Sequence, residues 1–171
     1  MKKQGFTLIE LMVVIVIMGI LAAVAVPKLF GMIAKSKASE VGPAAGTYVK
    51  MQQAYISEAV AIGNWKIIGY SAPGSNNFDY SEGTISWSNN TTALGSTAVD
   101  GWNAKNNVKL NDCGNGQINW KMSIKASTTS GAAAGDAEFA AGVSDKANYR
   151  CLELTPNFLT IGTPGTTNSI Q

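Results

Sequence analysis

The pattern of apolar and polar positions divides this chain into three stretches, of which the first is the most informative. Residues 6–26 are almost uniformly apolar, and Thr7 and Glu10 are the strongly polar side chains among them. At about 1.5 Å of rise per residue, a helix of this length spans roughly 30 Å, the thickness of a bilayer core. The stretch therefore predicts a helix able to cross a membrane, and the costly charge of Glu10 within it points to a function.

Residues 28–63 keep the helical period but are amphipathic. Apolar and aromatic side chains recur three or four positions apart, so we expect an apolar stripe that covers a globular head. Gly42-Pro43 predicts a bend in this helix, and Gly63-Asn64 predicts its end. Packing on the head is the favoured role for the aromatic members of the stripe, over electron transfer. The stripe consists of Val41, Ala45, Tyr48, Gln52, Tyr55, Ala59 and Ile62.

Residues 64–171 change to short strand-like runs separated by Gly, Asn, Ser and Thr. The strongest is 117–125, where Ile118, Trp120, Met122 and Ile124 alternate with polar residues. Weaker candidate strands are 65–69, 84–88, 138–143, 149–154 and 158–161, and the polar segments 71–77, 89–98 and 127–137 predict surface loops. A long helix followed by such strands predicts an α+β fold, in which the helix packs on an antiparallel β-sheet head.

Two interpretations of the N-terminus remain open at this point. Lys2 and Lys3 followed by an apolar run suit an ordinary secretory signal that is cut after Ala25, and the product would then be a soluble secreted domain, for example a carbohydrate-binding one. A cut between Gly5 and Phe6 would instead retain the apolar helix in the mature protein. The two interpretations imply different proteins, because only the second keeps Glu10.

The residues Lys3-Gln4-Gly5-Phe6-Thr7-Leu8-Ile9-Glu10-Leu11 resemble the class III signal of type IV pilins and of type II secretion pseudopilins. The resemblance implies that a prepilin peptidase cuts after Gly5 and methylates the amine of Phe6. It also implies that Glu10, with Thr7 beside it, serves assembly by meeting the terminal amine of a neighbouring subunit. An ammonium and a carboxylate in a low-dielectric bundle compensate each other's charge, although the same chain's amine lies within one turn of Glu10.

Gly19 and Pro27 extend the resemblance, because type IVa pilins place helix breakers near these points and unwind the helix between them in filaments. Gly is about 1 kcal/mol and Pro about 3 kcal/mol worse than Ala inside a helix. Both residues are also common in intact membrane helices. Local unwinding in an assembled state and a simple kink therefore both remain open.

Cys113 and Cys151 are the only cysteines, and the chain has no His. Two cysteines offer too few ligands for a zinc site and lack the Cys-x-x-Cys redox spacing. In an exported head they predict one structural disulfide, worth about 4 kcal/mol in the chain-entropy model. Type IV pilins often close a C-terminal loop in this way, but usually nearer the end of the chain than here.

Composition excludes several classes of function. Of the 13 Lys and Arg residues two, Lys2 and Lys3, lie in the leader, which leaves 11 basic against 11 acidic side chains and no general affinity for nucleic acid. Without His, nucleophile activation by His is unavailable, and we expect no catalytic residues, no cofactor and no metal.

The acids in predicted loops are interpreted as solvated charges, with a calcium site as the lesser alternative. They are Asp79, Glu82, Asp100, Asp112, Asp136 and Glu138. The Asn89-Asn90-Thr91-Thr92 segment carries sequon-like patterns but reads as a polar turn, and Trp87, Trp102 and Trp120 suit a core better than sugar stacking.

The sequence thus predicts a type IV pilin-like structural subunit, with a leader at 1–5, a transmembrane and filament-core helix at 6–27, an amphipathic helix at 28–63 and a disulfide-bonded head at 64–171. The resemblance implies an inner-membrane precursor that an assembly platform builds into a homo-oligomeric helical filament on the bacterial surface. A type II secretion pseudopilin and a soluble domain released after Ala25 are the alternatives. Adhesion, motility, DNA uptake and secretion are not distinguished, because the head carries no motif.

Overall fold

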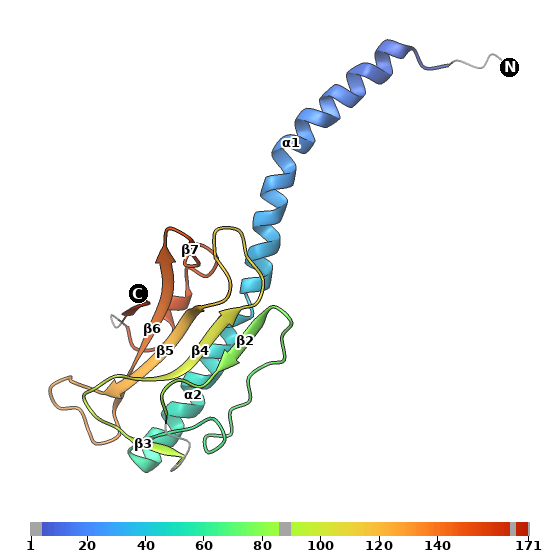
Figure 1. The fold of residues 1–171 in the computed structure, drawn as a ribbon. Helices are drawn as coiled ribbons and strands as arrows, with labels where there is room; N and C mark the ends of the chain where they lie inside the picture. The colour runs from blue at the N-terminus through green and yellow to red at the C-terminus, as the bar shows by residue number, and fades with distance from the viewer. Residues whose placement is uncertain (1–4, 86–89, 165–166, 171) are drawn as a thin grey trace.

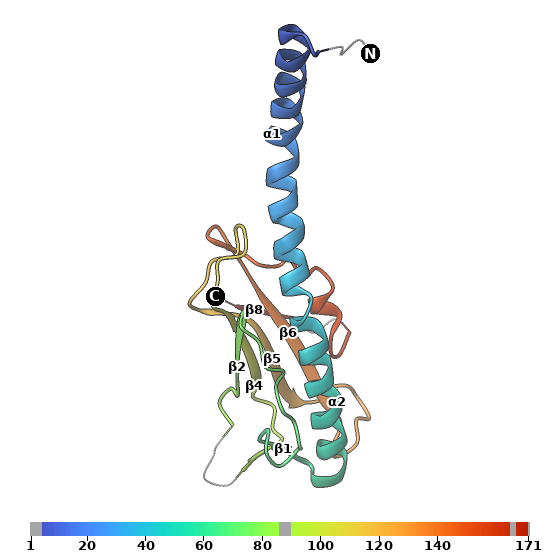
Figure 2. The same ribbon diagram turned by 90° about the vertical axis from the view of Figure 1, so that its right-hand side faces the viewer.

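A computed structural model describes residues 5–85, 90–164 and 167–170. The chain forms a long helical stalk and a head (Figure 1). The stalk is α1 (Leu8–Ala38), and α2 (Val41–Ala59) continues from it into the head. Figure 2 shows α2 lying across one face of a β-sheet while most of α1 extends away from the head. The structure therefore confirms the predicted α+β fold with a long N-terminal helix.

The strands form two sheets. β1 (Ala61–Gly63) pairs with β3 (Thr91–Ala93), and the larger sheet has the order β2-β4-β5-β6-β7, with antiparallel neighbours. β8 also pairs with β6, but in parallel. The larger sheet consists of β2 (Phe78–Ser81), β4 (Val99–Asn106), β5 (Ile118–Ala126), β6 (Ala137–Lys146), β7 (Tyr149–Arg150) and β8 (Thr167–Ile170).

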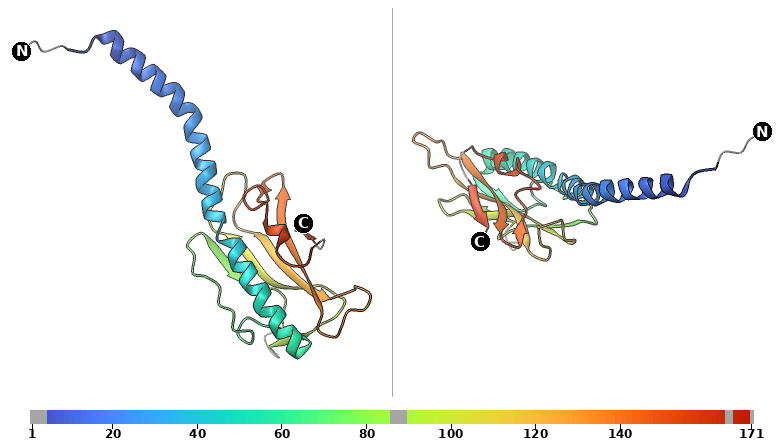
Figure 3. Two further views of the ribbon diagram at one scale, coloured as in Figure 1. Left: turned by 180° about the vertical axis from the view of Figure 1, so that it is seen from behind. Right: turned by 90° about the horizontal axis from the view of Figure 1, so that it is seen from above.

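The apolar part of α1 has no cover in the isolated chain. Every residue from 5 to 30 is exposed, and by length and composition this is a helix that could cross a membrane. The helix passes through Gly19 and Pro27 without interruption, and it curves along its length (Figure 3). Because Pro27 has no amide hydrogen, the carbonyl of Ala23 loses its helical donor there. Unwinding between Gly19 and Pro27 in an assembled state stays a prediction.

The break between the helices lies at Ser39 and Glu40, slightly before the bend expected at Gly42-Pro43. Pro43 is inside the first turn of α2, where helical amides have no intrahelical acceptor, so its missing N–H costs little there. The side chain of Glu40 accepts hydrogen bonds from the hydroxyls of Ser75 and Tyr80, the latter at 3.3 Å. The break is thus tied to the head by tertiary contacts.

The second helix ends earlier than the sequence predicts. α2 stops at Ala59, and Val60 adopts a left-handed conformation with φ of 52°, instead of the helix continuing to Gly63-Asn64. Gly63 belongs to β1, and the amide of Gln52 pairs with its backbone, donating to Gly63 O at 2.9 Å and accepting from Gly63 N at 2.8 Å. Strand pairing and this buried contact override the local helical pattern.

Several strand predictions need correction. The run 117–125 is confirmed as β5, and 138–143 lies within β6. Residues 65–69 form a turn, 158–161 contain the 3₁₀ helix η1 (Phe158–Thr160), and only the first two residues of 149–154 form a strand, β7. In 84–88 the described residues 84 and 85 are not in a strand, and 86–88 lie outside the described part. The predicted loop 89–98 contains β3.

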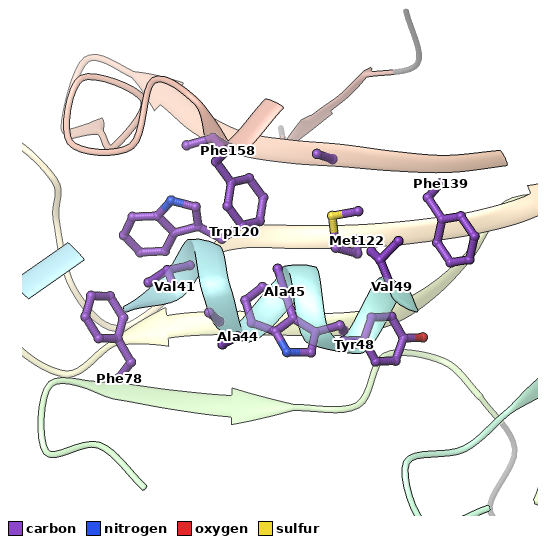
Figure 4. Packing of buried hydrophobic residues seen from close by; sticks show 14 of the residues in the cluster. Val41, Ala44, Ala45, Tyr48, Val49, Phe78, Trp120, Met122, Phe139 and Phe158 are labelled. Atoms are coloured by element: carbon purple, nitrogen blue, oxygen red, sulfur yellow. The ribbon is translucent and has the colours of Figure 1, made fainter. Parts of the chain in front are cut away.

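The core lies between α2 and the larger sheet (Figure 4). Val41, Ala45 and Tyr48 of the predicted stripe are buried there, in one cluster with Met122 of β5 and Phe139 of β6. Tyr55 is half-buried and Ala59 is exposed, whereas Ile56, which the stripe omits, is fully buried. The predicted stripe is therefore correct from Val41 to Gln52. In the last turns the buried position is Ile56 and not Tyr55, one residue later than predicted.

Two tryptophans that the sequence placed in the core are there. Trp102 and Trp120 are fully buried, and each indole N–H has an acceptor: Trp102 donates to Tyr70 Oη at 3.0 Å and Trp120 to Thr155 Oγ1 at 2.7 Å. Burial with satisfied donors makes these rings packing elements rather than exposed sugar platforms. Trp87 and Asn89 lie outside the described residues.

Tyr48 and Gly101 make a tight packing contact in this core. The Tyr48 side chain is fully buried, its hydroxyl has no hydrogen-bond partner among the described residues, and burial raises its pKa. A methyl group added to Gly101 would lie 2.0 Å from Tyr48 Oη and 2.7 Å from the Ile124 side chain. Gly101 is required because the tyrosine occupies the space of its side chain.

We predict that Gly101→Ala lowers the free energy of unfolding by about 1–3 kcal/mol through overpacking, or about 2–10 °C in thermal midpoint. Tyr48→Phe removes the unpartnered hydroxyl, so we expect it to be neutral or stabilising alone and to restore most of the loss in the double variant. Tryptophan fluorescence during heating measures both. Gly95→Ala, at a glycine with open space, is the control. Equal effects at Gly95 and Gly101 would refute the steric account.

Candidate assembly site at the N-terminal helix

The helix begins with a reciprocal capping arrangement between Thr7 and Glu10. Thr7 is the N-cap residue in an extended conformation, and its Oγ1 accepts from the Glu10 amide at 3.3 Å. In return, Glu10 Oε2 accepts from the Thr7 amide at 2.8 Å and from the Thr7 hydroxyl at 2.6 Å. This capping box satisfies donors at the start of the helix and places an acid in its first turn, where the helix dipole favours it.

The sequence leaves open which group Glu10 interacts with, and the capping box gives its partner within the isolated chain. In the isolated chain the carboxylate interacts with Thr7 of its own chain, and no Lys or Arg in the described part of the chain forms an ion pair with it. These hydrogen bonds reduce the cost of a carboxylate in an apolar segment but leave its charge uncompensated. The pattern Thr7-Leu8-Ile9-Glu10 has the spacing of a capping box, so the sequence carried a signal that our sequence analysis missed.

The Gly5–Phe6 bond lies outside the helix. Gly5, Phe6 and Thr7 have no regular secondary structure, and Phe6 is 85% exposed. A protease binds its substrate as an extended segment, so this bond is geometrically open to cleavage, whereas the Ala25 carbonyl of the alternative site lies within α1. Lys2, Lys3 and the rest of the leader up to Gln4 lie outside the described residues.

The helix after the capping box presents apolar side chains in every direction. Leu8, Ile15 and Leu21, for example, are each more than half exposed. A helix that is apolar all round is stable when lipid or other helices surround it. Burial in the head begins only at Ala34 and Ala38. The site therefore combines an uncovered apolar surface with one carboxylate near its beginning.

The head is fastened at its stalk end by the bond between Cys113 and Cys151, both of which are fully buried. The bond joins the turn after β4 to the residue that follows β7. The residues beyond Cys151 are not a free tail: Phe158 of η1 is buried in the core, and β8 adds to the sheet beside β6. This packing accounts for the unusual distance between the second cysteine and the end of the chain.

Three of the acids that we expected in solvated loops instead lie in strands and form ion pairs. Asp79, Asp100 and Glu138 pair with Lys105 at 3.2 Å, Lys121 at 3.7 Å and Lys125 at 3.0 Å, respectively. The hydrogen bond from Lys125 and that from the Thr128 amide lower the pKa of Glu138. Among the described residues no group of three or more His, Cys, Asp or Glu could hold a metal ion. Each of the three ion pairs joins neighbouring strands, which are β2 and β4, β4 and β5, and β5 and β6.

Comparisons with known proteins agree with the geometry at the N-terminus. Residues 1–26 match the family described as prokaryotic N-terminal methylation motif. Type IV major pilin protein PilA of Myxococcus xanthus is 44% identical over 57 residues, which are 33% of this chain and 26% of that protein. Type IV major fimbrial protein FimA of Dichelobacter nodosus is 56% identical over 39 residues, 23% of this chain and 25% of that protein.

Fimbrial protein EcpC of Eikenella corrodens is 54% identical over 44 residues, 26% of this chain and 29% of that protein. The chain thus spans between a quarter and a third of the length of these relatives. No solved structure matches the chain significantly. The family match covers residues 1–26, and the alignments with these three relatives cover between 23% and 33% of this chain.

The capping box makes a local prediction. Thr7→Val keeps the shape of the side chain but removes the hydroxyl, so we expect about 1 kcal/mol less stability of the first turn and about fivefold faster hydrogen exchange at the Glu10 amide. The measurement is amide exchange by NMR on the full chain in detergent micelles. Thr7→Ser keeps the hydroxyl and should exchange like the parent. Unchanged exchange in Thr7→Val would contradict a capping role.

Proposed function

We propose that this chain, whose N-terminal segment is that of the type IV pilin family, is a structural subunit of a type IV pilus filament. The observation that carries the proposal is the uncovered apolar helix α1, which begins with a Thr7–Glu10 capping box directly after an accessible Gly5–Phe6 bond. The named relatives are structural proteins of pili and fimbriae, which supports a structural rather than an enzymatic role.

The proposal assigns a sequence of states to the chain. The precursor waits in the inner membrane with α1 in lipid, prepilin peptidase cuts after Gly5, and Phe6 becomes the N-methylated first residue. An inner-membrane assembly platform then moves the subunit into a homo-oligomeric helical filament on the cell surface. In this scheme residues 1–5 are the leader, 6–27 form the filament core, 28–63 connect the core to the head, and 64–171 form the exposed surface.

Glu10 is the residue that gives assembly its register in this scheme. In the isolated chain its carboxylate has only the neutral donors of Thr7. Cleavage creates an ammonium at Phe6, and N-methylation keeps its positive charge. When helices bundle, the carboxylate can pair with the ammonium of a neighbour, which removes two uncompensated charges from a low-dielectric core. An unprocessed subunit lacks this cation at Phe6 and is disfavoured in the bundle.

Van der Waals packing between helices supplies the cohesion. Apolar side chains of α1 are as well solvated by lipid as by other helices, so close packing and polar contacts, rather than the hydrophobic effect, decide association within the membrane. Gly19 offers space for close approach, since apart from its chain neighbours and the helix backbone around it no atom lies within 4 Å of the position its Cβ would take. Local unwinding between Gly19 and Pro27 would let α1 lengthen as the filament forms.

The alternatives are separable. A type II secretion pseudopilin shares the N-terminal features, but the relatives named above are described as pilins and fimbrial proteins, which favours the pilus. Surface fibres that disappear when the secretion genes are deleted would instead assign the chain to the secretion system. A soluble domain released after Ala25 would lack Glu10 and the part of α1 that precedes Val26.

The mature N-terminus is the first test. We expect mass spectrometry of the chain isolated from its native cells to find N-methylated Phe6 as the first residue, because the Gly5–Phe6 bond lies before the helix and both residues are exposed. Deleting the peptidase gene should leave residues 1–5 attached. A mature protein that starts at Val26 would refute the pilin proposal.

Glu10→Ala is the second test. Removing the carboxylate leaves the neighbour's ammonium without a partner, a loss of several kcal/mol in a buried pair, so we expect filament yield to fall more than tenfold. The amount of chain in the inner membrane should not fall, because Ala is easier to insert than Glu. Sheared filaments and membrane fractions are quantified by immunoblot. Glu58→Ala, at an exposed acid in α2, is the control, and normal piliation of Glu10→Ala would refute the role of Glu10.

A further inference from the structure

We propose that a pocket between α1 and the disulfide-linked turns binds the phosphate of an anionic phospholipid and so holds the unassembled subunit at the membrane surface. This inference rests on the proposed function, because it requires α1 to lie in a bilayer before assembly. The pocket has a volume of about 330 Å³. Lys28 and Lys35 line it from α1, and Asn111 and Arg150 line it from the turns of the head.

The pocket lies at the level of the lipid headgroups. With residues 6–26 in the hydrocarbon core, Lys28 is about 3 Å beyond its edge and Lys35 about 10 Å further, at 1.5 Å per residue. The polar interface adds about 5–8 Å on each side of the core. The two lysines therefore bracket the phosphate layer. β7, which contains Arg150, is at the end of the head nearest the protruding part of α1 (Figure 1).

The charges of the pocket favour an anion. Lys28 and Lys35 form no ion pair within the described part of the chain, so both ammonium groups are available. Arg150 is paired with Glu153 at 2.6 Å, which orients the guanidinium while leaving it further donors. Asp112 is the remaining acid at the pocket, and its carbonyl accepts from the Arg150 amide at 3.1 Å. The pocket therefore carries three cationic side chains, those of Lys28, Lys35 and Arg150, and two carboxylates, those of Asp112 and Glu153.

A second hollow makes a lipid the best fit among anions. Lys28 and Met32 line the charged pocket and also an adjoining apolar hollow, which is completed by Ala25, Val26 and Leu29. That hollow has a volume of about 330 Å³ and runs along α1 past Lys28, from Met32 back to Ala25 and Val26 at the end of the membrane-length segment. A cationic pocket joined to an apolar groove in the direction of the bilayer matches a molecule with a phosphate at one end and an acyl chain below it. A free phosphate or a carboxylate of a neighbouring subunit would occupy only the charged pocket and would leave the apolar hollow empty.

The test uses the full chain in non-ionic maltoside micelles. The midpoint of thermal unfolding is followed during titration with dioctanoyl phosphatidylglycerol, with dioctanoyl phosphatidylcholine and with inorganic phosphate, because a ligand of the folded state raises it. We expect phosphatidylglycerol alone to raise the midpoint. Lys28→Gln/Lys35→Gln should weaken its apparent affinity by about 10- to 30-fold, since each surface cation contributes to attraction by anionic lipid.

Two further variants test whether binding depends on the charges of this pocket. Lys50→Gln/Lys66→Gln removes two exposed head lysines outside the pocket and should bind like the parent, whereas Asp112→Asn removes an opposing charge and should bind severalfold tighter. Equal responses to the two lipids, an equal response to inorganic phosphate, or equal losses in both double-lysine variants would each overturn the inference. These outcomes are independent of the filament proposal, which fails instead if Glu10→Ala assembles normally or the mature chain begins at Val26.

Discussion

An apolar helix that its own head cannot cover is the constraint on which the rest of this molecule depends. From Leu8 to Phe30 every side chain of α1 is exposed, and burial starts at Ala34. Such a surface must be covered by lipid or by other helices, and both environments lack water to satisfy polar groups. The chain is consistent with this requirement, because Thr7 and Glu10, the strongly polar residues of the segment 6–26, form hydrogen bonds with each other.

The head differs from α1 in that its own contacts bury the helix that enters it. α2 lies on the sheet with Tyr48 and Gln52 completely buried, and Gln52 connects the helix to the backbone of Gly63 in β1. Glu40 joins the break between the helices to Ser75 and Tyr80. Since these contacts run from the helix to separate parts of the head, the orientation of α2 on the sheet is set by packing and polar contacts together.

Where the stalk meets the head, covalent and electrostatic features come together. The disulfide holds the turn after β4 against the end of β7, and this places Arg150 opposite Lys28 and Lys35 of α1. These turns lie far along the sequence from α1, yet they become neighbours of its residues 28–35. The head therefore meets α1 directly after the uncovered apolar part of the helix.

The sequence by itself determined the membrane-length helix, the N-terminal motif that the family comparison matches, the amphipathic stripe through Gln52 and the strand β5, because each depends on local periodicity or on contiguous residues. It also carried the Thr7–Glu10 spacing. Only the tertiary structure decided the end of α2 at Ala59, the strand β4 and the parallel pairing of β8. β4 contains Asp, Gly, Asn and Lys and has little strand propensity, yet it lies between β2 and β5 with Trp102 in the core. Pairing between distant segments leaves no local pattern, and so the fold, not the sequence pattern, placed these elements.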